Sequence, residues 1–67
     1  MSVARTTEIT ATSTESFEAA SREGISRAVK TLRNVKSAWI KEQEVLLDDG
    51  KISEYKVTMK ITFVLDD

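Results

Sequence analysis

The side chains that most often carry catalysis or hold transition metals are missing from this sequence. It contains no cysteine and no histidine, which excludes disulfides, thiolate or imidazole zinc sites, haem ligation and nucleophilic catalysis centred on either residue type. Among the acids, Glu42 and Glu44 stand at alternate positions of a predicted strand and therefore share one face. Without a nucleophile and a base beside them, they indicate a charged surface, so we expect no enzyme.

The same two carboxylates suggest an alternative binding function. Ca²⁺ and Mg²⁺ prefer oxygen ligands, and several chains can supply such ligands together around a symmetry axis. A Ca²⁺ or Mg²⁺ site built from Glu42 and Glu44 of several copies is therefore one hypothesis. Residues 48–50 (DDG) are better explained as a tight turn, because the later acidic ligands of an EF-hand loop are missing.

The charge pattern argues against nucleic acid and membranes as partners. Ten basic and 11 acidic side chains give a net charge of −1, so the chain has no broad basic field. A basic cluster within residues 27–36 lies at the end of a predicted helix, where cations offset the helix dipole. No segment has the roughly 20 apolar residues of a membrane span, and residues 1–7 lack an apolar stretch of signal-peptide length. We expect a cytoplasmic protein.

The chemistry-bearing residues must be positioned by one small α+β domain, which we expect to span residues 1–67. Residues 3–10 are rich in β-branched side chains and predict a strand at an edge of the sheet or at a subunit contact, because their apolar face is weak. Thr12 or Ser13 is predicted to cap a helix of about 20 residues. Gly24 in mid-helix, at a cost of about 1 kcal/mol relative to alanine, is explained either by close packing or by a neutral change. Small and apolar side chains form one stripe of this helix: Phe17, Ala20, Gly24, Ile25, Ala28, Val29, Leu32 and Val35.

The second and third strands are predicted to form an antiparallel hairpin. Residues 37–47 are predicted to form the second strand, and residues 48–51 contain the Asp-Gly pair that tight turns favour. Strict alternation places Ser37 and Trp39 on one face of the second strand and the two glutamates on the other.

The third strand, residues 52–65, is the strongest pattern in the sequence. Its odd-numbered residues from Tyr55 to Leu65 are all apolar, and the residues between them are nearly all polar. Such a run spans roughly 45 Å, whereas a helix of about 20 residues spans only about 30 Å. The uncovered apolar surface predicts a homo-oligomer, which is also the remaining way to stabilise so small a chain without disulfides or a structural metal.

The order of these elements, together with four short segments, resembles the dodecin family over nearly the whole chain. The segments are residues 12–17 (TSTESF), 30–35 (KTLRNV), 49–52 (DGKI) and 54–65 (EYKVTMKITFVL). The resemblance implies a three-stranded antiparallel sheet curled around one helix, with twelve such βαββ subunits closing into a hollow shell. It also implies storage or sequestration of a flavin, riboflavin or FMN, rather than catalysis.

The resemblance further implies which residues contact the flavin. In flavin-binding members a Trp shortly after the helix end stacks on the isoalloxazine ring, and a Gln after a Glu-Tyr pair binds its edge. Alignment on residues 32–34 places Ser37 at the Trp position, with Trp39 two residues later on the same face, and places Lys56 at the Gln position. Ser37, Trp39 and Lys56 are therefore the candidate flavin-binding residues. Packing at a subunit contact remains open for Trp39, and a salt bridge to Glu42 or Glu44 remains open for Lys56.

Overall fold

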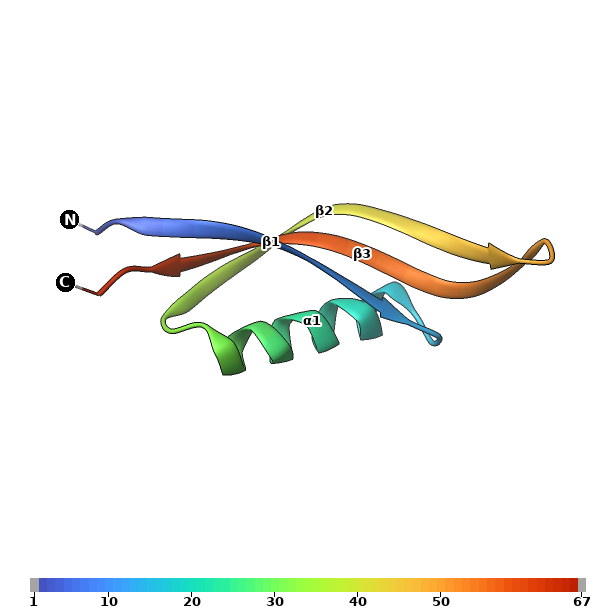
Figure 1. Ribbon diagram of the computed structural model, residues 1–67, viewed down its shortest axis with the longest axis horizontal. Helices are drawn as coiled ribbons and strands as arrows, with labels where there is room; N and C mark the ends of the chain where they lie inside the picture. The colour runs from blue at the N-terminus through green and yellow to red at the C-terminus, as the bar shows by residue number, and fades with distance from the viewer. Residues whose placement is uncertain (1, 67) are drawn as a thin grey trace.

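Residues 2–66 are described by a computed structural model, and residues 1 and 67 of the expected domain lie outside the described part. The elements are β1 (Ala4–Ser13), α1 (Phe17–Thr31), β2 (Val35–Asp48) and β3 (Lys51–Val64). The strands form one antiparallel sheet in the order β1-β3-β2, with α1 along one of its faces (Figure 1). The predicted βαββ architecture and the edge position of β1 are confirmed.

Helix α1 starts later than the sequence pattern predicted. Strand β1 continues to Ser13, so Thr12 and Ser13 both pair with β3 and neither caps the helix. The N-cap is Ser16, whose hydroxyl accepts a hydrogen bond of 2.9 Å from the Ala19 N–H. The helix therefore has 15 residues. Within residues 2–66 no helix combines the length and the apolar character needed to cross a membrane.

The core lies between α1 and the central strand β3, and its fully buried members are all apolar. Met59, Ile61 and Val57 from β3 have no exposed surface, and Ala20 and Ala28 meet them from the helix. The predicted buried face of β3 is thus confirmed at its middle. Val29 was expected in the helix stripe but is 55% exposed, because it points away from the sheet.

Gly24 marks the closest approach of the helix to the sheet. A Cβ atom added at this position would lie 2.9 Å from Cε of Met59 and 3.1 Å from Cβ of Ala11. Of the two explanations left open by the sequence, close packing is therefore the one the structure supports.

Replacing Gly24 with valine is expected to lower the melting temperature. A branched side chain meets both Met59 and Ala11, and overpacking of this kind typically costs about 1–3 kcal/mol. The matched control is Ser26→Val, which adds a β-branched residue at an exposed position of the same helix. Equal melting temperatures for the two variants would show that the Gly24 contact is unimportant.

The sheet is much longer than the helix that covers it. The molecule is 50 Å long, whereas 15 helical residues span about 22 Å. In Figure 1 the β2–β3 hairpin extends beyond the start of α1, and the chain ends extend beyond its other end. Apolar side chains are exposed at both overhanging ends: Leu47 (62%) and Ile52 (54%) near the hairpin turn, and Val3 (64%) and Leu65 (40%) near the chain ends.

Candidate ligand-binding face

The face of the sheet opposite α1 is predominantly polar and carries all the residues that the sequence predicted for ligand binding. The strand registers place polar side chains of β1 and β3 directly opposite one another on this face, such as Glu8 with Lys60. We call this surface the open face. Its residues are Thr6, Glu8, Thr10 and Thr12 from β1, Ser37, Trp39, Glu42 and Glu44 from β2, and Lys56, Thr58, Lys60 and Thr62 from β3.

Trp39 is the one large aromatic side chain of the open face. It is 61% exposed, although an indole in a monomer of this size would ordinarily be packed away. Its cross-strand neighbour is Lys60, whose Nζ lies 5.6 Å from the centre of the indole, within the range of a cation–π interaction. Ser37 lies two residues earlier and faces Thr62. An exposed indole beside a cation and hydroxyl groups can stack on a flat ring and hydrogen-bond its edge.

Two irregularities in the hairpin change which face the glutamates occupy. The register steps from Ile40–Met59 to Glu42–Thr58, so Lys41 has no partner in the ladder. Nearer the turn, the register skips Ser53, whose hydroxyl donates a hydrogen bond of 3.1 Å to the Leu46 carbonyl. These are β-bulges, and each shifts the alternation by one residue.

The prediction from strict alternation, that the glutamates lie on the face opposite Trp39, is therefore wrong. Between the bulges, Glu42 and Glu44 lie opposite Thr58 and Lys56 and share the open face with Trp39. An unbulged register would place them opposite Val57 and Tyr55, on the core side, where a carboxylate is costly to bury. The bulges place the glutamates on the polar face.

Lys56 lies on the open face but not beside Trp39. Its Nζ is 3.4 Å from Oε1 of Glu44, so the cross-strand salt bridge that the sequence left open for Lys56 forms with Glu44. Four positions along β3 separate it from Lys60, which corresponds to about 13 Å. Within one chain, the structure brings Ser37 close to Trp39 and leaves Lys56 apart from both.

The candidate metal ligands form an incomplete set within one chain. Among residues 2–66 no group of three or more acidic side chains is arranged to hold a metal ion. Glu42 and Glu44 provide two carboxylates on one face, and Glu44 is engaged with Lys56. A divalent cation site would need carboxylates from further copies of the chain.

The neighbour that the sequence reasoning missed is Lys60. Asp48 faces Lys51 at the turn, and counting back from this pair along both strands places residue 39 opposite residue 60. The structure has the same pair, because one bulge adds a residue to β2 and the other adds a residue to β3, so their effects on the register cancel. Lys41 was also missed; its Nζ lies 3.2 Å from Oε1 of Glu8 on the far strand of the sheet. Counting the hairpin register could have identified Lys60, whereas no sequence signal marked Lys41.

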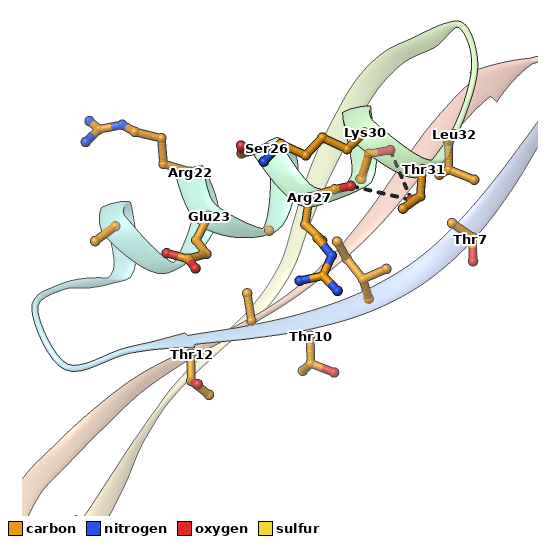
Figure 2. Close-up of a pocket in the computed structure, with 15 residues that line it drawn as sticks. Thr7, Thr10, Thr12, Arg22, Glu23, Ser26, Arg27, Lys30, Thr31 and Leu32 are labelled. Carbon is orange, nitrogen blue, oxygen red and sulfur yellow. Dashed lines mark hydrogen bonds between the residues drawn. The ribbon is translucent and has the colours of Figure 1, made fainter.

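A separate open groove lies between α1 and β1, on the opposite side of the sheet. It encloses about 1080 Å³ and is lined by both elements (Figure 2). Ser37, Trp39 and Lys56 do not line it. The groove and the open face are thus different surfaces, which adjoin along β1 at Thr10 and Thr12.

Comparison with known proteins identifies relatives of this chain. The dodecin family model matches residues 3–66. The dodecin of Streptomyces davaonensis is 41% identical, with 98% of this chain and 97% of that chain covered and a TM-score of 0.92. A point mutant of the T. thermophilus dodecin is 31% identical, with both chains fully covered and a TM-score of 0.92.

A third relative is described by its ligand. A calcium-chelating calcium dodecin from Mycobacterium tuberculosis is 26% identical over 97% of this chain and 93% of that chain, with a TM-score of 0.86. No curated protein sequence matches the chain. The family match, the fold and the sequence identity over nearly the full length of both chains agree with the resemblance seen in the sequence. The chain belongs to the dodecin family.

Proposed function

We propose that this chain is the subunit of a closed homo-oligomeric shell, a dodecamer as is typical of the family, that stores a flavin, riboflavin or FMN, at its subunit contacts. The observation that carries the proposal is the exposed indole of Trp39 on the open face. An isolated exposed Trp with polar neighbours is suited to a flat aromatic ligand that a second copy of the face encloses.

The small core and the long sheet support assembly. Five fully or nearly fully buried side chains form the centre of the core, and a chain of this size buries only about 60% of its unfolded surface when it folds alone. Apolar residues at both overhanging ends remain exposed in the single chain. Contact with further copies removes these side chains from water and supplies the stabilisation that the monomer lacks.

The polar groups around Trp39 fit the edge and the side chain of a flavin. Ser37 and Thr62 offer hydroxyl groups, and Lys60 offers a cation that suits a carbonyl oxygen or a phosphate. Lys56, which stands where the family resemblance implies Gln, is too far along the sheet to join Trp39 of its own chain, so we assign it to a neighbouring copy's site or to its salt bridge with Glu44. The bound flavin is held and shielded, and no catalytic step is proposed.

Titration is the direct test of the proposed ligand. FMN or riboflavin fluorescence is expected to be quenched as the purified protein is added, because stacking on an indole quenches an excited flavin, and the concentrated protein is expected to be yellow as isolated. An unchanged fluorescence signal with both flavins would rule out flavin storage.

Binding of a divalent cation is the second candidate function. The calcium dodecin of M. tuberculosis is the relative that favours it. Against it, Glu44 is paired with Lys56, and the described residues of one chain offer two carboxylates rather than a complete ligand set. We therefore propose a flavin, rather than a divalent cation, as the ligand.

Adding Ca²⁺ or Mg²⁺ is expected to leave the melting temperature unchanged. A cation that binds only the folded protein stabilises it by about 2.7 kcal/mol at one hundred times its dissociation constant, which a thermal scan with and without EDTA detects. A rise in melting temperature that is lost in Glu42→Gln would contradict flavin as the first choice and support the cation site.

A further inference from the structure

The β2–β3 hairpin carries an exposed surface that its own chain leaves uncovered. We call residues 45–54 the hairpin arm. Leu47 is 62% exposed, Ile52 is 54% exposed, and the two face each other in the ladder. The arm bears three acids against one lysine, a net charge of −2, and Asp48 and Asp49 form no ion pair with any of residues 2–66.

The groove between α1 and β1 carries the opposite charge to the hairpin arm. Ile9, Ala11, Ala28 and Leu32 contribute apolar surface to its lining, and its charged residues are three cations against one acid, a net charge of +2. Arg22 is paired with Glu18, whereas Arg27 and Lys30 form no ion pair within residues 2–66. Figure 2 shows Arg27 extending from the helix toward β1 across the opening.

The unpaired outer edge of β1 also favours contact between the groove and another chain. Strand β1 pairs only with β3, so its outer edge is unpaired in the single chain and borders the groove. Exposed strand edges are normally covered or blunted in native proteins. The groove of an isolated chain thus combines an apolar surface, unpaired cations and an unpaired backbone edge.

We propose that the hairpin arm of one copy docks into the α1/β1 groove of a neighbouring copy. The signs of charge are opposite, and exposed Leu47 and Ile52 meet apolar groove residues. The arm, with about five residues per strand, is about 17 Å long, and a helix of 15 residues offers about 22 Å. An arm cannot reach its own groove, because it points away beyond the start of α1 (Figure 1).

This contact is heterologous, since arm and groove are different surfaces of the same chain. Contacts of this kind close into rings or continue into open filaments, depending on the rotation between copies. The inference rests on the assembly part of the proposed function and is independent of the flavin. It assigns to the arm the role of joining neighbouring subunits.

Site-specific crosslinking tests the contact. The sequence lacks cysteine, so Leu47→Cys provides a single attachment point for a photoreactive maleimide at the arm. We expect intermolecular crosslinks from position 47 to residues 7–12 and 19–32, identified by mass spectrometry. The matched control, Lys36→Cys, also places the label on an exposed position of β2 but far from the arm, and it is expected to give no intermolecular crosslinks to those residues when a mixture of isotope-labelled and unlabelled chains separates them from crosslinks within one chain.

A charge swap provides a second, independent test. Asp48→Lys with Asp49→Asn makes the arm positive, and Asn tolerates the left-handed φ of 54° at position 49. Arg27→Glu with Lys30→Glu makes the groove rim negative. Each pair alone is expected to abolish the assembled peak in size-exclusion chromatography with light scattering, and the four substitutions together are expected to restore it, with circular dichroism showing a folded chain throughout.

The outcomes separate this inference from the assembly itself. A wild-type monomer would overturn the proposed shell and the docking together. An assembled wild type whose label at position 47 crosslinks only outside the groove, or a charge swap that leaves assembly unaffected, would overturn the docking and leave the shell standing.

Discussion

Replacing Trp39 with alanine is expected to weaken flavin binding roughly tenfold to hundredfold while leaving the assembly intact. Stacking on one aromatic side chain contributes about 1–3 kcal/mol, and each 1.4 kcal/mol changes a dissociation constant about tenfold. Trp39 is 61% exposed, so its removal leaves no cavity in the core. Equilibrium dialysis with FMN measures the change without relying on the quenching that the indole itself provides.

The matched variant is Trp39→Phe, which keeps an aromatic face and is expected to retain most of the affinity. The oligomeric mass of both variants should equal that of the wild type. If Trp39→Ala binds FMN as tightly as the wild type, the indole is a packing residue and the ligand lies elsewhere.

Replacing Met59 with alanine is expected to cause the largest loss of stability among single core substitutions. Met59 is fully buried at the centre of β3 and faces Gly24 of the helix. Truncating a buried Met to Ala typically costs about 2–5 kcal/mol, a large part of the roughly 5–15 kcal/mol that stabilises a typical native protein. Thermal unfolding at one fixed protein concentration measures the effect, because the stability of an oligomer depends on concentration.

Thr58→Ala is the control, since Thr58 neighbours Met59 in the chain but lies on the open face. It is expected to change the melting temperature by only a small fraction of the Met59→Ala effect. Comparable losses for the two variants would contradict the assignment of β3 faces.

The fold was predictable because its main signals are local and strong. The alternation of β3 identified Val57, Met59 and Ile61 as core, and all three are fully buried. The Asp-Gly turn fixed the antiparallel pairing of β2 with β3, and at Asp49 and Gly50 the backbone adopts φ angles of 54° and 76°. These features depend on residues close together in the sequence.

The errors arose where tertiary contacts override a local pattern. Ser13 is a good capping residue, yet pairing with Tyr55 extends β1 through it and moves the cap to Ser16. Glu42 and Glu44 were assigned to the wrong face because β-bulges insert residues without a clear sequence signal. The cost of burying carboxylates could have indicated a bulge, because strict alternation along β2 would point both glutamates toward the core.

The candidate site was predicted only in part. Ser37 and Trp39 lie together on the open face as expected, and Lys56 lies on that face at a distance from them. In the proposed function a second subunit completes the site, and residues that meet across a symmetry axis leave no spacing pattern within one chain. Lys60 was missed, although the hairpin register of one chain is enough to place it beside Trp39.

The most direct test of the central claim is the mass of the protein equilibrated with FMN, measured by light scattering as it leaves a size-exclusion column, with visible absorbance recorded in the same peak. Twelve chains of 7.5 kDa predict a single species of about 90 kDa that carries the flavin absorbance. A species of 7.5 kDa, or an assembled peak with no flavin absorbance after equilibration, would contradict it.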